Sequence, residues 1–196
     1  GASAVLGARL SAPTAAAALV CDAYGVPLIS PTATNESVWK LGDGVFQTNL
    51  TGLFEIRLLA QVARTVLLKE RFAVLYPDDP EGRRTAEDFS TEIANLGGVI
   101  VASAAYPPAG TDFRVPILEL REHRPEVIFA PATVDQMVML GPQLDFYKSG
   151  ALVLGLSHWN SERLRERAGG VLEGALLPSD LAMFRPRWTE EFYLHW

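Results

Sequence analysis

Residues 25–35 read GVPLISPTATN, an apolar run followed by a cluster of short polar side chains. Its apolar run ends at Ser30 and is followed by the short hydrogen-bonding side chains of Thr32, Thr34 and Asn35. A continuous apolar run is typical of a strand whose sheet is covered on both faces. Short polar side chains after such a strand serve either local turns and helix caps or a bound ligand. Both interpretations stay open for any one stretch taken alone.

Apolar runs of this kind alternate with longer amphipathic stretches along the whole chain. The expected strands are residues 4–6, 27–30, 72–76, 99–104, 127–130, 152–156 and 175–177. The expected helices are residues 13–24, 55–69, 83–96, 112–124, 134–148 and 161–168. Repeated β-α-β units of this kind predict an α/β fold with doubly wound parallel sheets and helices on both faces.

Three of the expected helices carry specific signals at their ends or interiors. Pro116 is tolerable only in the first turn, with Thr111 or Asp112 as the cap. We expect Pro142 to kink or break its helix, and Ser161 to cap the last helix.

The composition is that of an ordinary globular domain with an acidic balance. The chain has 196 residues and a net charge of −6, so it lacks the broad positive field that nucleic acid or an anionic membrane demands. The single cysteine, Cys21, cannot form an intrachain disulfide, and we interpret it as a small buried residue on a helix. No apolar stretch approaches the length of a membrane span, and no signal peptide is visible.

Catalytic and metal motifs are missing from the sequence. GLSHW at residues 155–159 lacks the second glycine of a nucleophile elbow, and neither a P-loop nor G-x-G-x-x-G is present. His123, His158 and His195 do not have metal-pair spacing. We therefore expect no catalytic residue, no metal and no cofactor.

Ligands of open parallel sheets bind beyond the carboxyl ends of the strands, and there the chain repeatedly places hydroxyl and amide groups. The stretches are GARLSAPT, SPTATN, YPDDPEG, APATVDQ and GLSHWNS. If several of these ends face one crevice, they form a site for a small polar or anionic ligand.

Several stretches occur in an order that resembles the periplasmic substrate-binding proteins of branched-chain amino acid transporters, the Leu/Ile/Val-binding type. They are AVLGARLSAPTAAAA, GVPLISPTATN, FAVLYPDDPEGRR, LGGVIVASAAYPPAGTDF, PEVIFAPA and LGLSHWNSERL with LEGALLP. The resemblance implies a two-lobed type I periplasmic-binding-protein fold that closes on its ligand by a hinge. It implies a non-catalytic, extracytoplasmic protein that binds a small polar ligand, an amino acid or a carboxylate, and works with an ABC permease.

The resemblance also implies that the chain is a fragment with a truncated first lobe. Residues 1–51 would be part of the first lobe, residues 52–177 the second lobe, and residues 178–196 a return to the first. Because about 50 residues bury little core, we expect residues 1–51 to pack against the second lobe, against residues 178–196 or against a second copy of the chain.

Ligand contacts carry over from the resemblance position by position. The serine that holds a ligand carboxylate falls on Ser11, and the two positions that contact the main-chain groups of an amino acid fall on Thr32 and Thr34. In the second lobe, the family's aromatic residue falls on Glu81 and its ammonium-binding acid on Ser157. The contacts expected in that lobe are Tyr76, Asp78, Thr133, Ser157 and His158.

An alternative comes from a subgroup that LGLSHWNSERL and LEGALLP also resemble, envelope proteins that activate penicillin-binding proteins. In that case the domain would bind an envelope protein and no small ligand.

Overall fold

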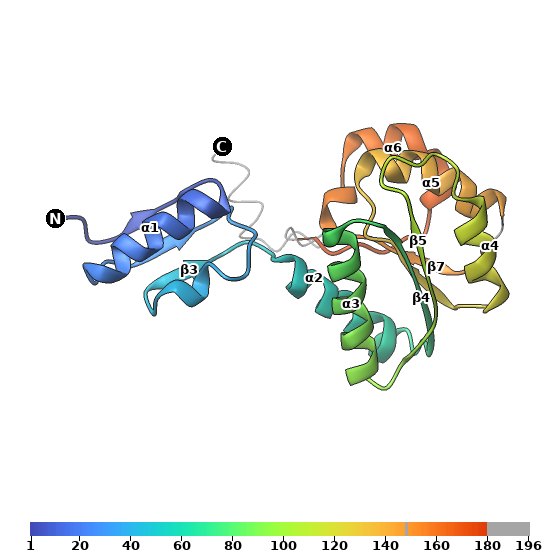
Figure 1. The fold of residues 1–196 in the computed structure, drawn as a ribbon, viewed down its shortest axis with the longest axis horizontal. Helices are drawn as coiled ribbons and strands as arrows, with labels where there is room; N and C mark the ends of the chain where they lie inside the picture. The colour runs from blue at the N-terminus through green and yellow to red at the C-terminus, as the bar shows by residue number, and fades with distance from the viewer. Residues whose placement is uncertain (148, 180–196) are drawn as a thin grey trace, which may run out of the picture.

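The computed structural model describes residues 1–147 and 149–179, which form two parallel β-sheets, each with its own helices (Figure 1). The first sheet has the strand order β1-β2-β3 and the second β5-β4-β6-β7, and every pairing is parallel. The strands are β1 (Val5–Leu6), β2 (Leu28–Ser30), β3 (Val45–Gln47), β4 (Arg71–Pro77), β5 (Val99–Tyr106), β6 (Val127–Phe129) and β7 (Leu152–Leu154). The predicted α/β class with parallel sheets is confirmed.

The described residues contain six α-helices, of which α1 to α5 lie between strands in the sequence and α6 follows β7. They are α1 (Ser11–Ala23), α2 (Gly52–Gln61), α3 (Pro80–Asn95), α4 (Arg114–Glu122), α5 (Val134–Phe146) and α6 (Glu162–Ala168). Short helical turns add η1 (Trp39–Leu41), the π-helical η2 (Val62–Val66), η3 (Ser157–Trp159) and η4 (Gly169–Leu172). No helix in the described part of the chain is both long and apolar enough to cross a bilayer.

Helices cover both faces of the second sheet. Alternate strand residues point to opposite sides, so each face packs against its own helices. Ala73 and Leu75 of β4 pack with α4, α5 and α6, whereas Phe72 and Val74 pack with α2 and α3. On the second face the Phe89 ring of α3 stacks on the Phe129 ring of β6, with centroids 4.2 Å apart. The continuous apolar strands of the second sheet thus have the double-sided cover that they predicted. For the run at residues 25–30 the prediction is wrong, because Leu6 (76% exposed) and Phe46 (52% exposed) pair beside Ile29 on an open face of the first sheet.

The first sheet is smaller and packs against α1. Ala18 and Cys21 of α1 form a buried cluster with Leu28 and Val45. Cys21 is a free, buried thiol on a helix, as the sequence indicated. In Figure 1 this sheet and α1 lie to the left of the larger unit, and α2 lies between them.

Two strand expectations need correction. The strand β3 was not predicted, although its residues pair in register with β2. Residues 175–177 form only one isolated bridge, from Leu176 to Leu154, instead of a strand. The predicted lobe boundary at residues 51 and 52 stays a prediction, and most of the proposed return segment, residues 180–196, lies outside the described residues.

Three helix expectations also need correction. The helix predicted to reach residue 69 leaves α-geometry after Gln61 and continues as the π-helical turn η2. The helix α5 runs through Pro142, so the predicted break is wrong, and the kink stays a prediction. The N-cap residue of α4 is Phe113, instead of Thr111 or Asp112, but Oδ1 of Asp112 still accepts from the first backbone N–H of the helix, that of Arg114, at 2.9 Å. The position of Pro116 in the first turn of α4 is as predicted.

Candidate ligand-binding cleft

A cleft of about 530 Å³ lies where the carboxyl ends of strands from both sheets meet. Its first-sheet wall follows β1, β2 and β3, and its second-sheet wall comes from α2, from α3 after β4, and from the loop after β7. The lining residues are Ser11, Thr34, Asn35, Glu36, Leu50, Gly52, Leu53, Glu55, Ile56, Glu81, Arg84, Thr85, Asp88, Leu156, Ser157 and His158. Four of the eight sequence-predicted contacts are among them: Ser11, Thr34, Ser157 and His158.

The first-sheet wall is built around the hydroxyl of Ser11, the first residue of α1. Its Oγ accepts hydrogen bonds from the backbone N–H groups of Thr34, at 3.2 Å, and Asn35, at 3.1 Å. These bonds fasten the loop after β2 to the start of α1. Thr34 is exposed and lines the cleft, and no hydrogen bond joins its hydroxyl to the described residues, so this side chain can meet a ligand.

Thr32 belongs to the same loop but lies outside the lining. Its Oγ1 donates to the backbone carbonyl of Arg9 at 2.8 Å. The structure therefore separates two threonines that the sequence grouped together: Thr32 makes a local fastening, and Thr34 lines the cleft.

The second-sheet wall contains a buried carboxylate that the sequence analysis did not identify. Glu55, in the first turn of α2, is 6% exposed. Its Oε2 accepts from the backbone N–H of Ser157 at 2.8 Å, and its Oε1 accepts from the Ser157 hydroxyl at 2.6 Å. The helical spacing could have predicted this burial. Glu55 and Leu59 are four residues apart, so they share the buried face of the helix.

The loop after β7 that carries Ser157 and His158 rests on Trp159, which is 3% exposed. The indole Nε1–H of Trp159 donates to the carbonyl of Ala132 at 2.7 Å, and Nε2 of His158 lies 3.0 Å from the same oxygen. Gly155 fits beneath the Trp159 ring, where a Cβ would overlap ring atoms. The buried Trp159 ring thus anchors the loop, and His158 is exposed at the cleft.

Three predicted contacts of the second lobe lie outside the lining and have local partners. Tyr76 packs, partly buried, on the cluster between β4 and α3. Asp78 pairs on the surface with Arg83, one turn into α3. Thr133 is the N-cap of α5 and forms a capping box with Gln136. Apolar packing accounts for Tyr76, an ion pair for Asp78 and cap chemistry for Thr133, so each has a local role, as Thr32 does.

Carboxylates dominate the charge of the cleft. Four acids, Glu36, Glu55, Glu81 and Asp88, face one guanidinium, Arg84, which gives the lining a formal charge of −3 with His158 neutral. Burial raises the pKa of Asp88, Arg84 opposes this, and the nearby carboxylate of Glu36 raises it further. The raised pKa reflects a site where negative charge is partly desolvated and crowded.

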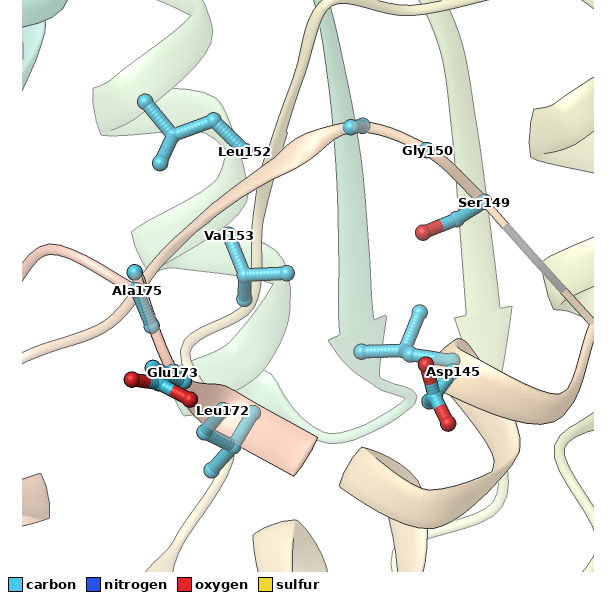
Figure 2. A pocket seen from close by; sticks show the side chains of 11 residues that line it. Asp145, Ser149, Gly150, Leu152, Val153, Leu172, Glu173 and Ala175 are labelled. Carbon is cyan, nitrogen blue, oxygen red and sulfur yellow. The ribbon is translucent and has the colours of Figure 1, made fainter. Parts of the chain in front are cut away.

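A second cavity, also of about 530 Å³, lies beside β7, the edge strand of the second sheet (Figure 2). It is lined by the segment that leads into β7, including Ser149 and Leu152, and by Leu172 to Ala175. This is the amino end of β7, whereas ligands of parallel sheets bind at carboxyl ends. Its lining also comes from one sheet only, so we assign the ligand site to the first cleft.

Among residues 1–147 and 149–179, no group of three or more His, Cys, Asp and Glu side chains could hold a metal ion.

A sequence model of the family described as "Periplasmic binding protein" matches residues 1–177. A search of curated proteins found no match. Many solved structures match the fold. A Rhodospirillum rubrum protein described as a branched-chain amino acid ABC transporter is 22% identical, with a TM-score of 0.87 over 98% of this chain and 56% of that one.

Two further structures were solved with ligands. The branched-chain amino acid substrate-binding protein LivJ from Streptococcus pneumoniae, in complex with isoleucine, is 25% identical with a TM-score of 0.62, over 86% of this chain and 48% of that one. A solute-binding protein from R. palustris, in complex with 4-hydroxybenzoate, is 17% identical with a TM-score of 0.57, over 82% and 44%. The chain therefore spans about half the length of the structures it resembles.

Proposed function

The chain belongs to the periplasmic binding protein family, and from that premise we propose that it captures a small polar solute in the cleft between its two sheets. The observation that carries the proposal is the convergence of Ser11, Thr34, Ser157 and His158, which follow strands of different sheets, on one cleft. The family is one of binding proteins, so we propose capture and release without catalysis. The alternative, an envelope module that binds only a protein partner, gains no support from the comparisons.

The proposed mechanism is closure of the two walls on the solute. The first-sheet wall offers the hydroxyls of Ser11 and Thr34, and the second-sheet wall offers Ser157 and His158. Contacts from both walls stabilise the closed arrangement only when a ligand bridges them. Because its relatives are substrate-binding proteins of ABC transporters, we propose that the solute is passed to an ABC permease and that the chain acts outside the cytoplasm.

Thermal unfolding tests the proposal directly. A ligand that binds only the folded chain at 100 times its Kd stabilises it by about 2.7 kcal/mol. For a chain of this size, about 2–4 °C per kcal/mol gives a rise in Tm of about 5–11 °C. The measurement is a screen of amino acids and small carboxylates by differential scanning fluorimetry, with isothermal titration for every hit.

Thr34→Val and Thr32→Val form a matched pair of variants in one loop. Thr34→Val removes a hydroxyl that faces the cleft, so we expect Kd to rise about 2- to 10-fold, the value of one hydrogen bond. Thr32→Val removes a hydroxyl bonded to Arg9 outside the lining and should leave Kd unchanged. A screen without any Tm rise contradicts the function, and equal effects of the two variants contradict the placement of the site.

A further inference from the structure

Glu55 is a buried carboxylate on the wall of the cleft, and no cation of the described chain neutralises it. The ion pairs among residues 1–147 and 149–179 involve other acids. Both donors that Glu55 receives from Ser157, the backbone N–H and the hydroxyl, are electrically neutral. Buried acidic side chains are ordinarily paired, because desolvation of an uncompensated charge is costly.

The carboxylate also has unused hydrogen-bonding capacity. An ionised carboxyl group offers about four acceptor positions, and Ser157 occupies two. Since Glu55 lines the cleft, a molecule bound there can reach it. An ammonium group has three donors and a positive charge, so it would supply both the missing hydrogen bonds and the missing counter-charge in charge-assisted bonds.

The other charges of the cleft act in the same direction. Arg84 is the only guanidinium of the lining; its side chain is 69% exposed, and its Nε lies 3.7 Å from Oδ2 of Asp88, an acid of the same lining. The remaining carboxylates, those of Glu36 and Glu81, add negative charge. A carboxylate ligand without an amine would meet a lining in which four acids outnumber the one guanidinium, and so a net repulsion.

Resting on the proposed function, we infer that the solute carries an ammonium group, and that Glu55, positioned by Ser157, is the residue that binds it. The inference distinguishes amines and amino acids from simple carboxylates such as hydroxybenzoates, which the fold alone does not. It also assigns a specificity-determining role to a residue of α2, 102 positions away in sequence from the serine that orients it.

The decisive comparison uses the unmodified 196-residue chain and ligands that differ by one group. Leucine, isoleucine, alanine and phenylalanine are each titrated beside the analogue without the ammonium group and the analogue without the carboxylate. For leucine these are 4-methylpentanoate and 3-methylbutylamine. We expect the best amino acid or amine of the panel to bind at least 10-fold more tightly than its deaminated analogue. Added salt should reduce the ratio of the two Kd values, because it screens the attraction between the ammonium group and the carboxylates.

The variant Glu55→Gln keeps the side-chain shape and removes the charge. Loss of one charge-assisted contact predicts a rise of about 10- to 100-fold in Kd for amine-bearing ligands. Glu119→Gln, on the exposed surface of α4 outside the cleft, carries the same chemical change and should leave Kd unchanged.

The possible results distinguish a failure of the role of Glu55 from a failure of solute capture itself. Deaminated carboxylates that bind as tightly as their amino acids, or a Glu55→Gln variant with unchanged Kd, overturn the role of Glu55 and leave solute capture standing. No binding by any of these ligands, or by 4-hydroxybenzoate titrated beside them, overturns solute capture and this inference with it. If Glu55→Gln fails to fold, the ligand comparison on the unmodified chain still decides.

Discussion

Replacing Ser157 by alanine removes the hydroxyl that donates to the buried carboxylate of Glu55. The bond is short, 2.6 Å, and its acceptor is 6% exposed. The second bond to Glu55, from the backbone N–H of Ser157, remains in the variant. Only one donor is therefore lost, and the carboxylate stays buried without a full set of partners.

The magnitude follows from the charge on the acceptor. A hydrogen bond to a charged group contributes about 1.5–3 kcal/mol, compared with about 1 kcal/mol for a neutral pair. With about 2–4 °C per kcal/mol for a chain of this length, we expect Ser157→Ala to lower Tm by about 3–12 °C. Urea denaturation monitored by circular dichroism gives the free energy of unfolding independently.

Ser90→Ala is the matched control. The Ser90 hydroxyl of α3 is also partly buried, but it donates to the carbonyl of Ala86 within its own helix. Such back-bonding adds little to helix stability, so its loss should change the free energy of unfolding by less than about 0.5 kcal/mol. Equal effects of the two alanine variants would refute the claim that the Glu55–Ser157 bond is a strong, charge-assisted tie between α2 and the β7 loop.

Three further perturbations test other parts of the structure. Gly155→Ala places a Cβ into the ring of Trp159, so we expect a loss of about 1–3 kcal/mol in urea denaturation and a shift in tryptophan fluorescence. Thr133→Ala removes the cap of α5 and should cost about 1 kcal/mol by the same assay, whereas Thr133→Ser should retain most of it. Two backbone N–H groups lower the pKa of Glu126 below its ordinary 4.5 in the folded state. The lowered pKa stabilises the folded chain fully at pH values above the unfolded-state pKa of Glu126, and this stabilisation is lost as the pH falls through the folded-state pKa. In the variant Glu126→Gln the free energy of unfolding should therefore fall less steeply as the solution is acidified.

The sequence was sufficient for the fold wherever buried strands formed continuous apolar runs. It was insufficient where pairing, not composition, makes a strand. The apolar run of β3 is only Val45 and Phe46, close to Gly42 and Gly44, so its strand character comes from hydrogen bonds with β2. The same reasoning explains α5, where packing of Met137 and Leu144 on the sheet holds a helix that Pro142 alone would interrupt.

Residue type alone did not determine which side chains line the cleft. Serine and threonine after a strand are ambiguous, and the structure resolves the ambiguity differently for residues two positions apart, since Thr32 bonds to Arg9 and Thr34 lines the cleft. The position of Ser157 suggested that the cleft lacked an acid. In the folded chain the serine instead holds the carboxylate of Glu55, which arrives from another helix. A charge at a binding site is a property of the assembled wall, because any segment that packs there can supply it. A substitution at one position therefore does not establish that the charge has been lost.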